Sequence, residues 1–150
     1  MGARDADRDL AEFMGVDEIA ALVERHRDLY VRWSRGPEVD AGGHSRDELT
    51  GVPLPGLSAS ALDVEPWWGR RPVRLWVARR LYDYAHLPKR RGPGVRPWLL
   101  RGRCVGRGPD NEPLVIAERA VGWISRSALR EARELVDAQQ GPWGPLDRHP

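Results

Sequence analysis

The sequence predicts a single α+β domain, in which about three helices pack on a small, mostly antiparallel sheet. Three observations predict this class: a helical pattern followed directly by an alternating strand, two apolar strands joined by a Gly/Pro-rich loop, and an amphipathic helix after them. The chain has 150 residues, which is the size of one domain. We expect the domain to span residues 17–140, with a flexible N-terminus over 1–16 and a flexible tail over 141–150.

The N-terminal part of this domain predicts a helix, a strand and a long loop. Residues 17–27 place apolar side chains at helical spacing, and Asp17 is a suitable N-cap. Residues 29–34 alternate in the manner of a half-buried strand. Its two faces carry Leu29, Val31 and Trp33 on one side, and Tyr30, Arg32 and Ser34 on the other. Residues 38–53 are polar and rich in glycine, which favours a surface loop.

The middle of the chain predicts a helix over residues 72–84, with a strand over residues 73–77 as the alternative for its first part. Pro72 suits the first position of a helix. Apolar side chains fall on two sides of this helix, which is typical of a buried one. Arg79 and Asp83 stand four residues apart, where they are placed to form an ion pair. A basic loop rich in glycine and proline follows over residues 88–97.

The C-terminal third predicts a β-hairpin and a last helix. Residues 98–105 and 114–124 are apolar segments with strand character, and the eight residues 106–113 join them. Ser125 or Ser127 then caps a helix with an apolar stripe, and a segment rich in glycine and proline ends it.

Composition excludes several classes of protein. No apolar run approaches the roughly 18–20 residues needed to span a bilayer, and the polar N-terminus is unlike a signal peptide. The chain has one cysteine and four histidines, and they do not show the spacing of a metal site. We therefore expect a cytoplasmic protein without a membrane partner or a metal. The sequence indicates neither a cofactor nor an oligomeric state.

The net charge of +2 hides a strong segregation of charge along the chain. Residues 1–69 carry a net charge of −7, and residues 70–107 carry +11. Such a basic segment predicts an anionic partner, for example a phosphate, a nucleotide or a nucleic acid. Alternatively, the acidic first third packs against the basic middle. The residues that we expect a nucleic acid to contact are Arg70, Arg71, Lys89, Arg90 and Arg91.

Tryptophans, arginines and a carboxylate form the first part of a candidate ligand site. Adjacent side chains of an extended chain point apart, so one of Trp67 and Trp68 fills the core while the other stacks on a ligand ring. Arg32 and Arg35 are placed to bind a carboxylate or a phosphate. Glu65 is a partner for one of these arginines or a general base. The alternative interpretation is purely structural: two core tryptophans and an ordinary salt bridge.

The hairpin loop supplies the second part of this candidate site. Asp110 and Glu112 stand two residues apart and suit acid–base chemistry, and Arg107 and Asn111 add polar ligand contacts. The alternative is a solvated turn, in which the Asp and Asn side chains bond to their own backbone. The site forms if this loop, the first strand and the segment 58–68 converge in the folded protein.

Six blocks of the chain also carry a family resemblance. They are residues 29–37, 47–51, 54–58, 64–68, 75–84 and 105–115. These blocks resemble a family of small, uncharacterised actinobacterial proteins of the Streptomyces type, which is catalogued as a domain of unknown function. The resemblance covers about residues 17–137. It implies a cytoplasmic bacterial protein with a single domain, and it assigns no activity.

A second resemblance follows from the order of a few polar residues. Arg32 or Arg35, then Ser58-Ala59-Ser60, then Glu112 follow the order of the functional residues in ADP-ribosyltransferase-type folds. This resemblance implies an enzyme that uses NAD, with Ser58 and Glu112 as catalytic residues and Glu112 stabilising positive charge at the ribose. The chain departs from the pattern at Gly36-Pro37, which follows the arginines closely, and at the Pro-rich turn before Ser58.

Three functional hypotheses follow from these patterns. The first is a small domain that binds an anionic or aromatic, nucleotide-like small molecule. The second is the NAD-using transferase, and the third is a nucleic-acid-binding module that uses the basic segment 70–107. The sequence leaves open whether the protein is an enzyme.

Overall fold

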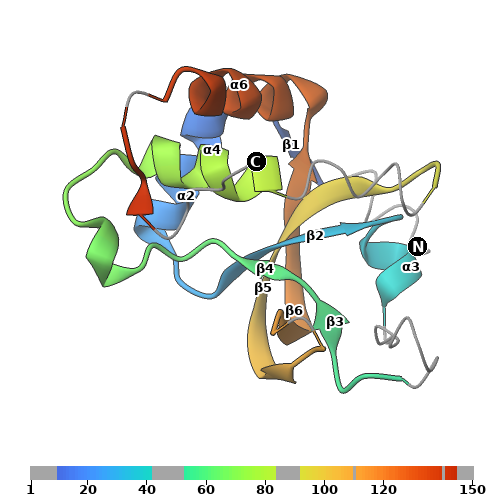
Figure 1. Ribbon diagram of the computed structural model, residues 1–150. Coiled ribbons are helices and arrows are strands. Elements are labelled where there is room, and N and C mark those ends of the chain that lie inside the picture. The colour runs from blue at the N-terminus through green and yellow to red at the C-terminus, as the bar shows by residue number, and fades with distance from the viewer. Residues whose placement is uncertain (1–9, 42–52, 84–91, 110, 140, 145–150) are drawn as a thin grey trace.

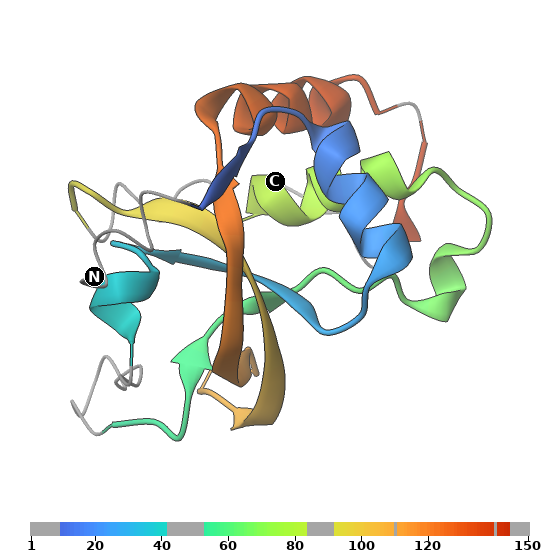
Figure 2. The same cartoon turned by 180° about the vertical axis from the view of Figure 1, so that it is seen from behind.

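A computed structural model describes residues 10–41, 53–83, 92–109, 111–139 and 141–144 (Figure 1). These residues form a six-stranded curled sheet, with helices α2, α4 and α6 gathered at one end of it (Figures 1 and 2). The α+β class is therefore confirmed. The expectation of a mostly antiparallel sheet needs correction, because the sheet is mixed: β1 runs parallel to β6, which is its neighbour.

The strand order explains why the sheet curls back on itself. The order is β1-β6-β5-β2-β4, and β3 pairs with β6. Only Ala59 separates β3 from β4, yet β3 pairs with β6 while β4 pairs with β2. The two short strands thus bridge opposite ends of the sheet. The bounds of the strands are β1 Ala11–Phe13, β2 Leu29–Ser34, β3 Leu57–Ser58, β4 Ser60–Ala61, β5 Arg96–Arg107 and β6 Pro113–Ile124.

Strands β5 and β6 form a long, strongly coiled ribbon. Their pairing register shifts at three points, and such bulges bend a strand and increase its twist. Gly102 permits the close approach of the two strands. A Cβ atom at this position would lie 2.5 Å from Val115 Cγ1 and 2.6 Å from the carbonyl oxygen of Ile116.

Strand β2 lies at the centre of the fold, and its two faces meet two different cores. The alternation of residues 29–34 is as predicted, but the strand is buried on both faces, so the expectation of a half-buried strand is wrong. Leu29, Val31 and Trp33 pack under the helices. On the other face, Tyr30 packs with Trp98, Leu100 and Val115 inside the curl of the sheet. The curl covers the face that an open sheet would leave in water.

The helices form a layer over the first face of β2. They are α2 (Val16–Arg25), α4 (Val73–Asp83) and α6 (Arg126–Asp137). Asp17 was expected as the first N-cap, but the cap position is Gly15, and the carboxylate of Glu131 accepts the N–H of Val16 at 2.7 Å. Ser125 caps α6 as predicted, by accepting the N–H of Ala128 at 3.1 Å.

The structure has regular elements and a buried side chain in segments that the sequence analysis predicted to be flexible or to form a loop. Strand β1 lies within the predicted flexible N-terminus, and the short helix α3 (Pro37–Asp40) overlaps the start of the predicted loop 38–53. Trp143, in the predicted tail, is buried against the helical core. Among the described residues, no helix combines the length and the apolar character that crossing a bilayer requires.

Candidate functional site

A buried polar cluster surrounds the guanidinium of Arg32, on the face of β2 that lines the curl. Arg32 Nε donates to Asp40 Oδ2 at 2.7 Å, Nη2 donates to Asp40 Oδ1 at 3.4 Å, and Nη1 donates to the carbonyl oxygen of Ser58 at 2.7 Å. The hydroxyl of Ser34 donates to Asp40 and accepts the indole N–H of Trp98 at 2.9 Å. The cluster therefore joins β2, α3, β3 and β5.

These contacts decide what the polar cluster does chemically. A buried charge is costly unless it is paired and hydrogen-bonded, and Asp40 supplies that pairing to Arg32. The structure thus brings Arg32 and Ser58 together, as the candidate site required, but it engages the guanidinium with a carboxylate of the same chain. Arg35 is exposed, and its side chain lies beside Gly92 and Gly94 instead.

The pKa of Tyr30, on the face of β2 that lines the curl, is raised above its ordinary value. Burial is the main cause that raises the pKa of its phenol. Cys104, Asp28 and Asp63 raise it further, while Arg107 lowers it. A phenol with a raised pKa stays protonated at neutral pH, so Tyr30 is neither a base nor a nucleophile there.

The predicted hairpin residues form a compact turn at the far end of the ribbon. Gly108 N–H donates to the carbonyl oxygen of Glu112 at 2.9 Å, and Arg107 Nη1 donates to that of Asn111 at 3.3 Å. The carboxylate of Glu112 lies over Gly108. Strand β3 runs beside this turn, because Ser58 pairs with Leu114. Asp110 lies outside the described residues, as do Lys89, Arg90 and Arg91 of the basic segment.

The two predicted tryptophans lie elsewhere, in the short helix η1 (Pro66–Trp68). Trp68 is buried and Trp67 is 37% exposed, and their rings meet edge to face with centroids 5.8 Å apart. Trp76 and Trp143 complete the aromatic cluster. Glu65 accepts the indole N–H of Trp67. Both views place η1 at the opposite side of the molecule from β3 and α3 (Figures 1 and 2), so indole and Arg32 do not share a site.

The structure gathers a different set of charged residues on the outer face of the ribbon. Arg101 on β5 pairs with Leu29 on one side and with Arg119 of β6 on the other. Residues that pair across strands share a face of the sheet, and Leu29 faces the helical core. Arg101 and Arg119 therefore continue this face beyond the helices. Arg103 follows Arg101 by two residues, and all three arginines are exposed. We call Arg101, Arg103 and Arg119 the arginine face.

The arginine face differs in its partners from the buried arginines Arg32 and Arg79, which each meet a carboxylate. Arg101 and Arg119 stand directly opposite each other, which is an unfavourable placement for like charges. Within the part of the chain that the structure describes, no carboxylate forms a salt bridge with either of them or with Arg103. An exposed row of unpaired guanidinium groups is suited to phosphates, which it can bind in a bidentate manner.

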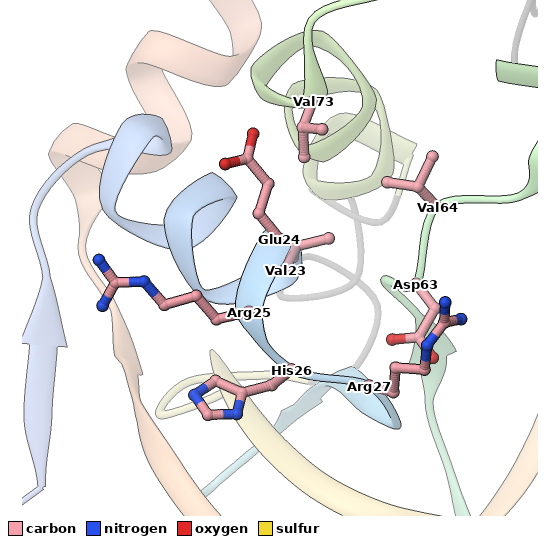
Figure 3. A pocket seen from close by; sticks show the side chains of 8 residues that line it. All are labelled: Val23, Glu24, Arg25, His26, Arg27, Asp63, Val64 and Val73. Atoms are coloured by element: carbon pink, nitrogen blue, oxygen red, sulfur yellow. The ribbon is translucent and has the colours of Figure 1, made fainter. Parts of the chain in front are cut away.

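A hollow of about 240 Å³ lies at the C-terminal end of α2 (Figure 3). Val23, Val64 and Val73 give it an apolar floor. The charged and polar residues around them are Glu24, Arg25, His26, Arg27 and Asp63. Arg25 and His26 extend on one side of the hollow, and Arg27 and Asp63 lie on the other (Figure 3).

The hollow and the arginine face are joined through the main chain. Asp28 follows the residues of the rim, and its carbonyl oxygen accepts the N–H of Gly102 at 3.1 Å. Gly102 stands between Arg101 and Arg103 on β5. Asp63 fixes the same corner, because its carboxylate accepts the N–H of Asp28 at 2.8 Å. The residue that follows Arg27 of the rim is therefore hydrogen-bonded to the strand that carries Arg101 and Arg103.

The arginine face was not among the predicted site residues. Its sequence signal was the alternation of arginine with small residues along 101–104, which predicts that Arg101 and Arg103 share one face of a strand. Neither a curated protein nor a solved structure matches the chain. A family model matches residues 6–144, which is most of the chain. The chain therefore belongs to a family of unknown function, DUF6098.

Proposed function

We propose that this domain binds nucleic acid through the arginine face. The observation that carries the proposal is the pair Arg101 and Arg119, two exposed like charges directly opposite each other. Like charges in this position destabilise a sheet. A phosphate backbone offsets this repulsion, because each phosphate that a guanidinium neutralises also releases condensed counterions.

The shape of the ribbon favours nucleic acid over an anionic membrane. Three register shifts coil β5 around β6, so the arginines follow a twisted surface. The phosphate backbone of a flexible single strand can follow such a surface, whereas a bilayer presents a flat surface. The sequence analysis gave a nucleic-acid-binding module as its third hypothesis, after the small-molecule ligand and the NAD-using transferase, and named other residues of the segment 70–107.

The other two hypotheses receive less support from the geometry. A small anionic ligand would have to compete with Asp40 for Arg32, and the tryptophans expected to stack on its ring lie on the other side of the molecule. The NAD-using transferase requires Glu112 to approach the ligand, but its carboxylate folds over Gly108 in the hairpin turn.

The test compares two triple variants that lose the same charge. One replaces Arg101, Arg103 and Arg119 by Gln, and the other replaces the exposed α6 residues Arg126, Arg130 and Arg133 by Gln. Binding to a labelled single strand and to its duplex is followed by fluorescence anisotropy over a salt series. We expect the salt dependence of the arginine-face variant to be shallower. The magnitude of the negative slope of log K against log[salt] should fall by roughly 2 for the single strand and about 3 for the duplex.

The α6 variant controls for net charge, because it changes the charge by the same amount on another element. Its salt slope should stay close to that of the wild type. Equal loss of affinity in both triple variants would contradict the proposal, because general charge would then explain the binding. Binding to phosphatidylserine vesicles without binding to either oligonucleotide would replace nucleic acid by a membrane surface.

A further inference from the structure

The hollow beside the arginine face points to the form of the nucleic acid. Its floor consists of three valines, of which Val64 and Val73 are only partly buried. Its rim carries both acidic and basic groups. This combination matches a nucleobase, which has apolar faces and polar edges.

We propose that this hollow receives an unpaired base of a single strand whose phosphates lie on the arginine face. This inference rests on the proposed function. The N–H of Gly102, which stands between Arg101 and Arg103, donates to the carbonyl oxygen of Asp28, the residue that follows Arg27 of the rim, so the two surfaces are joined through the main chain. Unpaired bases can leave the strand and stack on side chains, whereas the bases of a duplex are already stacked and paired.

Two residues carry the expected contacts with the base. His26 is exposed beside the hollow, and its flat ring, which extends to the side away from the three valines (Figure 3), is one of the side-chain surfaces on which bases stack. Arg27 stands at the other side of the hollow, where its guanidinium can donate to the edge of the base. Asp63 is engaged with the backbone of Asp28 and Leu29, so it shapes the rim.

The experiment uses three labelled probes: a single strand, a strand of the same length with abasic sites throughout, and a duplex. The single strand and the abasic strand carry the same backbone charge, so they differ only in bases. Anisotropy titrations of the wild type should show the base-bearing single strand binding about 5-fold or more tightly than the abasic strand. The duplex should bind more weakly than the single strand.

Two variants of the hollow locate this difference. His26→Ala removes the ring, and Val64→Phe fills the hollow without a change of charge. Both should bind the abasic strand like the wild type and lose most of the preference for the base-bearing strand. Tyr82→Ala removes a ring that is exposed on α4, outside the hollow, and should keep the preference. Thermal melting of each variant tests whether it is folded. His26→Ala should remain folded, because it removes only an exposed side chain.

The outcomes separate this inference from the proposed function. Equal wild-type affinity for the base-bearing and abasic strands overturns the use of the hollow, while steep salt dependence would still support binding by the arginine face. Tighter binding of the duplex also overturns the hollow inference. Absence of binding to all three probes overturns the proposed function itself.

Discussion

The arginines inside the fold and those on the outside of the ribbon have opposite environments and partners. Arg32 and Arg79 are buried, and each meets a carboxylate: Asp40 at 2.7 Å and Asp83 at 3.5 Å. Arg101 and Arg119 are exposed and face each other across the ribbon. The same residue type therefore stabilises the interior in one place and adds repulsion to the sheet in the other.

This difference teaches which arginines of an arginine-rich chain bear on function. A buried arginine with its own carboxylate is explained by the fold, since pairing offsets the cost of burial. An exposed arginine opposite another arginine is not explained by the fold, because a neutral residue would be at least as stable there. The comparison predicts that substitutions inside change stability, whereas substitutions outside change binding.

The largest effect is expected from Asp40→Ala, which leaves Arg32 buried without its carboxylate. Removing one partner of a buried ion pair typically costs about 3–5 kcal/mol of unfolding free energy. The hydroxyl of Ser34 also loses Asp40 as its hydrogen-bond acceptor, which adds to this cost. Denaturant unfolding should therefore show a much lower midpoint for the variant.

The matched control for this prediction is Asp17→Ala. Asp17 pairs with Arg74 at 3.0 Å, but its side chain is 72% exposed. Exposed pairs contribute at most about 1 kcal/mol, so this variant should unfold close to the wild type. If the two variants lost equal stability, the buried pair of Arg32 and Asp40 would contribute no more to the unfolding free energy than an exposed pair.

A smaller loss is expected from Gly102→Ala, which changes the ribbon without changing its charge. The added methyl group would lie 2.5 Å from Val115 Cγ1 and 2.6 Å from the carbonyl oxygen of Ile116, so the strands must move apart. Overpacking of this kind costs about 1–3 kcal/mol. Thermal unfolding measures this loss, and Gly141→Ala is the control, because no atom lies within 4 Å of the added group. Equal melting temperatures of the two variants would show that β5 and β6 can move apart at residue 102 without a loss of stability.

Local patterns were sufficient to predict much of the fold. Alternation identified the strand 29–34 with its observed bounds, and helical spacing identified α4, including the pair of Arg79 with Asp83. The hydroxyl of Ser125 was a sufficient signal for the start of α6. Each of these features depends on residues within a few positions of one another, so periodicity and capping chemistry reveal them.

Long-range pairing was beyond the same patterns. Strands β3 and β4 have two residues each, which is too short for a periodic signal, yet they bridge the ends of the sheet. The N–H of Val16 is satisfied by Glu131, which lies on the last helix. The pairing of β3 and β4 accompanies the burial of the second face of β2, so the burial of Arg32 could not be predicted from the pattern of its own strand.

The candidate site illustrates the same limit. Trp67 and Arg32 each have a residue type suited to ligand binding, but only the fold shows that η1, which carries Trp67, lies on the opposite side of the molecule from α3 and β3, which contact Arg32. The arginine face depends on the pairing register of β5 with β6, which three bulges shift. Counting arginines along the sequence does not reveal which of them stand opposite each other.

The smallest effect on stability, and the most specific one, is expected from Arg119→Gln. Removing one of two opposed like charges should raise the unfolding free energy by about 0.2–1 kcal/mol, while it weakens binding to an oligonucleotide. Arg103→Gln is the matched control: it removes the same charge from the same face, but Arg103 stands opposite Ile116. It should therefore weaken binding without a gain in stability. Denaturant unfolding at low salt measures the difference, which added salt should diminish because it screens exposed charges. If Arg119→Gln and Arg103→Gln changed stability equally, the repulsion across the ribbon would be absent, and with it the physical argument that these arginines serve a partner outside the chain.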